Sequence, residues 1–238
     1  MDITKDFRLF AKDHNVSMSV YDDVVSKTNN GGITNPYNSL TPVILEERQL
    51  HASPVDIYSR MLLDRIIFFG NEFNTETCNI VTAELLYLDS IGNKDINIYI
   101  SSPGGDVAAG LSNIAVIQYI KSSVATTCVG TAASMAAVLL SCGEKGKRFI
   151  LPYGRVMVHD IASGFRGKYR DIEIDFENTQ SYRDDIFNIL AANTGKSYDE
   201  IKEICARDYW MKGEKAVEFG IVDKIIASTK KPQESPLL

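Results

Sequence analysis

Residues 124–140 read Val-Ala-Thr-Thr-Cys-Val-Gly-Thr-Ala-Ala-Ser-Met-Ala-Ala-Val-Leu-Leu. The run 125–129 predicts a buried strand, and the small-residue run 135–140 predicts a helix directly after it. Ser134 therefore stands at a strand-to-helix junction, close to free backbone N–H groups and the positive end of the helix dipole. This setting suits the nucleophile of an acyl transfer, because the oxyanion forms beside those donors. Taken alone, however, the junction favours an ordinary serine N-cap.

Strands and helices alternate on both sides of this junction. The predicted strands cover 66–69, 95–100, 125–129, 148–151, 156–159 and 222–226, and the predicted helices cover 55–63, 74–89, 107–121, 135–140, 171–193, 197–207 and 213–219. Ser53-Pro54 is typical of a helix start, and Ser197-x-x-Glu200 is a capping box. The alternation predicts an α/β fold with mostly parallel strand pairing.

Composition limits the possible partners and the compartment. The 238 residues are 45% hydrophobic and 24% charged, with a net charge of −6, which argues against a nucleic-acid surface. The apolar stretch 124–140 is interrupted by polar residues and is too short to span a bilayer. No signal peptide is recognisable, so we expect a cytoplasmic protein without membrane contact. Four scattered cysteines and only three histidines predict reduced core thiols and no metal site.

The two ends differ from the regular central part. Residues 1–40 contain the turn-rich run Lys-Thr-Asn-Asn-Gly-Gly-Ile-Thr-Asn-Pro, which leaves no room for a core. We expect this segment to be a propeptide or a disordered extension, followed by an irregular piece over 41–53. The regular domain is predicted for 55–227, and 228–238 is expected to be a flexible tail.

A serine nucleophile needs a base to take its proton. His14 and His51 lie outside the regular domain, whereas His159 ends the predicted strand 156–159. A lone histidine at a strand end is more often a hydrogen-bonded core residue. If histidine activates Ser134, however, His159 is nearly the only candidate.

A third group would be a carboxylate that fixes the imidazole tautomer. Asp208 precedes Tyr209-Trp210, an aromatic pair that would shield it from water, but it would equally serve as a salt-bridge partner of Arg207. Asp160 is a weaker candidate, because neighbouring residues of a strand point to opposite faces.

Ser101-Ser102-Pro103-Gly104-Gly105 links a predicted strand to a predicted helix. Two glycines there allow another backbone to approach closely and leave N–H groups free, as an oxyanion hole and a rail for an extended peptide require. A plain tight turn is the competing interpretation. A phosphate loop is not expected, because no Gly-Lys-Ser/Thr follows.

The segment 161–168 contains Ser163, Gly164 and Phe165 and leads into the long predicted helix. It would offer either an exposed strand edge for a peptide substrate or simply a flexible connection. Its position suggests a projecting handle that a partner subunit covers.

Six segments, in this order and with these gaps, are similar to segments of proteolytic subunits of the Clp protease family. They are Asp56-Ile57-Tyr58-Ser59-Arg60-Met61-Leu62, Ser102-Pro103-Gly104-Gly105, Ala132-Ala133-Ser134-Met135, Arg155-Val156-Met157-Val158-His159, Asp171-Ile172-Glu173-Ile174 and Arg207-Asp208. The resemblance covers about 41–227. It implies a crotonase-like fold of repeated β/α units with a projecting strand–long-helix handle.

The resemblance also implies roles for individual residues. Ser134 corresponds to the nucleophile of a serine endopeptidase, His159 to its base and Asp208 to the group that orients the base. The backbone N–H groups of Gly105 and Met135 correspond to the oxyanion donors. Substrate-binding residues of the family correspond to Gly104, Gly105, Ser163, Gly164 and Phe165. No cofactor is implied for this subunit.

The resemblance further implies an assembly and partners. Family members form two stacked heptameric rings, on which an ATP-driven AAA+ unfoldase of the Clp type docks and feeds unfolded polypeptides into the chamber. On this basis 41–54 is the axial pore loop, Tyr99 and Tyr119 belong to the docking pocket, and Asp171 and Arg207 couple ring contact to activity.

The chain departs from the family pattern at several positions. Ala136 stands where a glycine is usual, Asp160-Ile161 replaces Gln-Pro, and Ser163 replaces a glycine of the substrate-binding arm. Two other functions are compatible with the fold: an inactive structural paralogue within the ring, and an acyl-CoA enzyme of the crotonase superfamily. The intact set Ser134, His159 and Asp208 favours the peptidase.

Overall fold

The computed structural model describes the backbone of residues 43–48 and 51–226, and it describes side chains from residue 55 onward. The chain divides into two compact units, with the boundary between Asp64 and Arg65. The predicted extension 1–40 and the predicted tail 228–238 lie outside the described residues.

The first unit contains a β-hairpin followed by a short helix. Strands β1 (Val43–Arg48) and β2 (His51–Asp56) pair antiparallel, and α3 (Ile57–Leu63) follows directly. The expectation of an irregular piece over 41–53 and of a helix start at Ser53-Pro54 is therefore wrong. The helix begins at Ile57 because the Asp56 carboxylate accepts hydrogen bonds from two free N–H groups of the first turn, at 3.1 Å each.

The second unit is built on a seven-stranded sheet in which β3, β4, β5, β6 and β9 are neighbours in that order. The strands are β3 (Ile66–Phe69), β4 (Ile96–Ser102), β5 (Val124–Ala133), β6 (Arg148–Ile150), β7 (Arg155–Val158), β8 (Tyr209–Lys212) and β9 (Lys224–Ile225). All pairs are parallel except β7 with β8, which confirms the predicted mostly parallel α/β fold. Strand β8 was not predicted.

Strand β5 is the centre of this sheet and is longer than the predicted 125–129. On one side it pairs with β4, and on the other it pairs first with β6 through 126–128 and then with β7 through 131–133. Ser134 therefore follows the last residue of β5, directly beside the end of β7.

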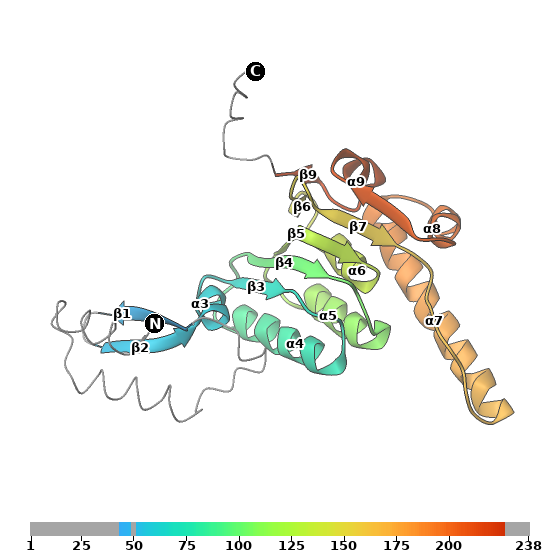
Figure 1. Cartoon of the computed structure of the whole chain (residues 1–238), viewed down its shortest axis with the longest axis horizontal. Coiled ribbons are helices and arrows are strands. Elements are labelled where there is room, and N and C mark those ends of the chain that lie inside the picture. The colour runs from blue at the N-terminus through green and yellow to red at the C-terminus, as the bar shows by residue number, and fades with distance from the viewer. Residues whose placement is uncertain (1–42, 49–50, 227–238) are drawn as a thin grey trace, which may run out of the picture. The chain divides into compact units, whose positions relative to one another are not determined.

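Helices α4, α5 and α6 lie side by side on the sheet, and α7 lies next to α6 (Figure 1). The helices are α4 (Thr75–Ser90), α5 (Val107–Tyr119), α6 (Met135–Ser141), α7 (Tyr169–Thr194), α8 (Tyr198–Cys205) and α9 (Glu214–Phe219). The predicted N-caps at Asn74 and Ser197 are confirmed, and both form capping boxes. Every residue of α6 is buried. None of the helices in the described part of the chain is long and apolar enough to cross a membrane.

The first half of α7 projects from the body of the unit (Figure 1). The buried residues of α7 are confined to its second half: Ile186, Phe187 and Leu190. Segment 159–168 runs beside the projecting half and forms neither strand nor helix, so the predicted strand edge is not present in it.

A buried ion pair joins β6 to the residue just before β9. The guanidinium of Arg148, whose side chain is 5% exposed, donates to both carboxylate oxygens of Asp223 at 2.6 and 3.0 Å. Burial alone would raise the pKa of Asp223. The hydrogen bonds and charge of Arg148, together with the hydrogen bond from the Gly146 N–H, outweigh this effect, so the pKa lies below its ordinary value.

We expect Asp223→Asn to lower the free energy of unfolding by about 3 kcal/mol, because it leaves the Arg148 charge buried without a counter-charge. Since the folded-state pKa of Asp223 is lowered, the carboxylate stabilises the parent fully above about pH 4, and this contribution is lost as the pH falls through the folded-state pKa. Urea unfolding of the parent and the variant at several pH values measures both effects. The exposed Lys147–Asp95 pair provides the control, because Asp95→Asn should cost less than about 1 kcal/mol. Equal losses in the two variants would contradict this interpretation.

Candidate active site

Ser134 occupies a strained turn between β5 and α6. Its φ of 55° and ψ of −125° are unusual for a residue with a side chain and cost about 1–3 kcal/mol. The turn is held because the Ser134 N–H donates to the Met157 carbonyl and its own carbonyl accepts from the Ala137 N–H, both at 2.9 Å. The hydroxyl makes no capping bond to α6, so the N-cap interpretation is wrong.

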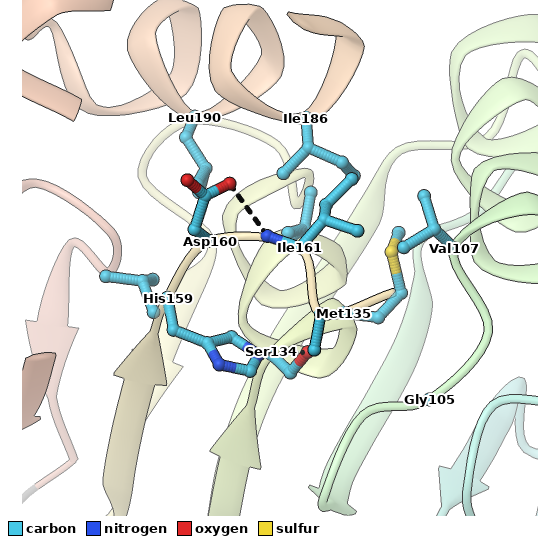
Figure 2. Close-up of a pocket in the computed structure, with 12 residues that line it drawn as sticks. Gly105, Val107, Ser134, Met135, His159, Asp160, Ile161, Ile186 and Leu190 are labelled. Atoms are coloured by element: carbon cyan, nitrogen blue, oxygen red, sulfur yellow. Dashed lines mark hydrogen bonds between the residues drawn. The ribbon is translucent and has the colours of Figure 1, made fainter. Parts of the chain in front are cut away.

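The Ser134 hydroxyl contacts a histidine instead. The Nε2 atom of His159 lies 2.9 Å from Ser134 Oγ, and the two side chains face each other at the strand ends (Figure 2). The contact follows from the sheet register, because Ala133 pairs with Met157 and both parallel strands end at the same edge. A neutral imidazole that accepts the hydroxyl proton at Nε2 carries its own proton on Nδ1.

Asp208 faces the other nitrogen of this imidazole. Its Oδ1 atom lies 3.4 Å from His159 Nδ1. The antiparallel pair β7–β8 brings the two together, because Val158 pairs with Tyr209 and His159 and Asp208 extend the same register. The Asp208 side chain is 64% exposed, so the predicted shielding by the aromatic pair that follows it is wrong. Within the described residues, the Asp208 carboxylate contacts the His159 imidazole and forms no ion pair with Arg207.

Asp160, the weaker carboxylate candidate, forms an ion pair with Arg183. Its two oxygens accept hydrogen bonds from the Arg183 guanidinium, each at 2.7 Å, and Oδ1 also accepts from the Ile161 N–H at 2.8 Å (Figure 2). The hydrogen bonds from Arg183 hold the pKa of Asp160 below its ordinary value.

The glycine turn packs directly against the serine turn. Gly104 and Gly105 have φ values of 95° and 144°. A Cβ atom at Gly104 would lie 2.6 Å from both Ala133 O and Ser134 Cβ, and one at Gly105 would lie 2.4 Å from the Phe73 carbonyl oxygen. Neither position therefore accommodates a side chain without displacing backbone. The Phe73 N–H donates to the Gly104 carbonyl, and the Phe73 carbonyl accepts from the Asp106 N–H. The Gly105 N–H takes no part in this pairing.

Two backbone N–H groups are thereby available beside Ser134. Within the described residues, neither the Gly105 N–H nor the Met135 N–H has a hydrogen-bond acceptor. Both residues line a cavity of about 150 Å³ that also contains Ser134 and His159. Two N–H donors next to a nucleophile are able to stabilise a negatively charged oxygen.

The cavity wall is mainly apolar. It includes Val107, Val138, Ile161, Ala162, Ile186 and Leu190. Sequence reasoning missed these residues. The spacing of Ile186 and Leu190 placed them on one face of α7, but nothing in the pattern related that face to Ser134.

The other predicted site residues lie outside this cavity. Ser163, Gly164 and Phe165 are exposed, and the Phe165 ring contacts Phe176 of α7, with ring centroids 5.9 Å apart. Tyr99 is a half-buried residue of β4, and Tyr119 is exposed at the end of α5. Asp171 lies in the first turn of α7, and Arg207 is exposed between α8 and β8.

The described part of the chain contains no candidate metal cluster, and its cysteine thiols have raised pKa values. The residues there contain no group of three or more histidine, cysteine or carboxylate side chains suited to holding a metal ion. All four cysteines are free, and burial raises the pKa of Cys128 to about 11 and that of Cys205 to about 12.

Comparison with known proteins gives a consistent result. The family model described as "Clp protease" matches residues 49–229. An "ATP-dependent Clp protease proteolytic subunit" of Bacteroides fragilis (strain YCH46) is 45% identical over 93% of this chain and 98% of its own. Proteins of the same name from Bacteroides thetaiotaomicron and Porphyromonas gingivalis are each 44% identical, over 93% and 81% of this chain and 98% and 87% of their own.

Proposed function

Because the chain belongs to the Clp protease family and is a serine endopeptidase of the Clp type, we propose that Ser134, His159 and Asp208 form its catalytic triad. The observation that carries this proposal is the 2.9 Å contact between Ser134 Oγ and His159 Nε2, with Asp208 on the far nitrogen. This is the order of groups that a serine nucleophile needs in order to lose its proton.

The first half of the reaction forms an acyl-enzyme. Ser134 Oγ attacks the carbonyl carbon of a peptide bond while His159 Nε2 takes the hydroxyl proton. The new negative charge on the carbonyl oxygen is stabilised by the Gly105 and Met135 N–H groups, each worth about 3 kcal/mol in the barrier. His159 then gives its proton to the leaving amine as the carbon–nitrogen bond breaks.

Hydrolysis reverses these roles. A water molecule loses a proton to His159 and attacks the ester carbon, and His159 returns the proton to Ser134 Oγ as the acid product leaves. Asp208 holds the imidazole in one tautomer and stabilises its charged form in both halves. The apolar cavity beside Ser134 takes an apolar side chain of the substrate.

The relatives are named proteolytic subunits of ATP-dependent proteases. We propose that this chain is likewise a subunit of a larger assembly and that its protease depends on ATP. Tyr169, Ile174 and Phe176 on the projecting half of α7 are exposed, which favours a second copy of the chain as their cover. The proposed assembly is two stacked heptameric rings with α7 between them.

The partner in this proposal is an AAA+ unfoldase of the Clp type that uses ATP and supplies unfolded polypeptides. Tyr99 and Tyr119 are proposed to belong to its docking pocket, and the β1–β2 hairpin to the axial pore. Asp171 and Arg207 are proposed to couple ring contact to activity, and Ser163, Gly164 and Phe165 to contact the substrate main chain in the assembled particle.

A fluorophosphonate probe tests the catalytic assignment, because it reacts only with an activated serine. We expect one adduct per chain, located on Ser134 by mass spectrometry, and none in Ser134→Ala or His159→Ala. Native mass spectrometry of the same sample reports the number of subunits. An adduct on another residue, or an unmodified but fully assembled particle, would contradict the proposal. Binding of a CoA thioester without peptidase activity would favour an acyl-CoA enzyme instead.

A further inference from the structure

The ion pair Asp160–Arg183 joins the residue after His159 to helix α7. Both guanidinium–carboxylate hydrogen bonds measure 2.7 Å, the geometry of a bidentate pair. The side chains are 35% and 29% exposed, so the pair is partly shielded from water.

The Arg183 end of this pair is firmly anchored. Its guanidinium carbon lies 4.8 Å from the centre of the Phe187 ring, and Phe187 is fully buried. The Phe187 ring also makes an edge contact with Tyr198 of α8, with ring centroids 5.8 Å apart. Arg183 thus lies in the second half of α7, which contains the buried residues of the helix, and not in its projecting half.

The Asp160 end fixes the backbone at the active site. Strand β7 ends at Val158, so His159 is the first residue without the support of strand pairing. The Asp160 carboxylate binds the Ile161 N–H, and Ile161 and Ala162 form part of the cavity wall. The Asp160 carboxylate therefore restrains the backbone that connects His159 to the cavity wall.

His159 needs support of this kind, because its other restraint is weak. The contact with Asp208 is 3.4 Å long and involves a largely exposed carboxylate. A contact of this length restrains an imidazole less than a hydrogen bond near 2.8 Å does. A misplacement of about 1 Å in a catalytic group costs roughly 100-fold in rate.

We propose that the Asp160–Arg183 ion pair positions His159 against Ser134 and fixes the adjoining wall of the cavity, so that helix α7 controls the alignment of the base. This inference rests on the proposed roles of Ser134 and His159. Neither Asp160 nor Arg183 touches the reacting atoms, and both are positioning residues.

The test compares Asp160→Ala, Arg183→Ala and the double variant in the full chain. We expect each single variant to slow fluorophosphonate labelling of Ser134, and kcat for a short fluorogenic peptide, by roughly 10- to 100-fold. Because the two residues act as one unit, the double variant should be no slower than the worse single variant. Arg183→Lys keeps the positive charge but loses the bidentate hydrogen bonding of the guanidinium. It should therefore be faster than Arg183→Ala but slower than the parent.

The exposed pair Lys147–Asp95 supplies the matched control, since it joins the starts of two strands at the edge of the sheet away from Ser134. Asp95→Ala and Lys147→Ala should keep the labelling rate within about twofold. If the alanine variants do not fold, Asp160→Asn, which preserves size but removes the charge, carries the comparison with the parent.

Two outcomes would overturn the inference: folded variants that are labelled within twofold of the parent, and a double variant whose loss is the product of the single losses. A purely structural role would lower the melting temperature without slowing labelling below that temperature. An unreactive parent would instead remove the proposed function, so the two failures are distinguishable.

Discussion

Replacing Ser134 with alanine is expected to lower the rate of peptide hydrolysis by a factor on the order of 10⁶. The alanine removes the nucleophile but keeps the backbone, and the hydroxyl is not needed to cap α6. The variant should therefore fold and assemble as the parent does. Hydrolysis of a short fluorogenic peptide measures the rate, and native mass spectrometry measures the assembly.

Ser112→Ala is a suitable control for this prediction. Ser112 is an exposed serine of α5, and its hydroxyl donates to the Ala109 carbonyl of the same helix. Its removal should leave the rate unchanged within about twofold. A Ser134→Ala variant that hydrolyses the peptide near the parental rate would show that the reaction uses another nucleophile.

Replacing Asp208 with alanine is expected to lower kcat by about 10³-fold and to leave KM nearly unchanged. Losing the carboxylate of a buried triad costs about 10⁴-fold, because the imidazole loses its correct tautomer and its counter-charge. The effect should be smaller here, since water reaches the exposed Asp208 and replaces part of what is lost. Steady-state kinetics with the same peptide separate kcat from KM.

Asp199→Ala provides the comparison for this second change, because Asp199 is an exposed carboxylate in the first turn of α8. It should have almost no effect on either constant. If Asp208→Ala loses less than about tenfold, the orientation of His159 rests mainly on the Asp160–Arg183 pair. If KM rises strongly, Asp208 also takes part in substrate binding.

The elements with strong local signals were predictable from the sequence. Strand β3 was predicted with its observed bounds, and Asn74 and Ser197 mark helix starts because their side chains satisfy free N–H groups locally. Ser134 and His159 were found because each ends an apolar strand, and parallel strands end at a common edge.

Features that depend on pairing at long range were not predictable. Strand β8 has four residues and an aromatic start, and it is a strand because β7 lies beside it. The exposure of Asp208 follows from its place at the open end of this pair. The contact between Asp160 and Arg183 joins the segment after β7 to α7, and local periodicity carries no information about it.

The sheet order has a consequence for the making of the protein. On a translating ribosome, β5 and β7 are synthesised before α7 and α8, and β8 follows only after both helices. A nascent chain that ends before Asp208 therefore carries Ser134 and His159 but lacks both the carboxylate that faces His159 and the strand that pairs with β7. If Ser134, His159 and Asp208 form the proposed triad, full peptidase activity requires synthesis to pass Asp208 and to complete the pairing of β8 with β7.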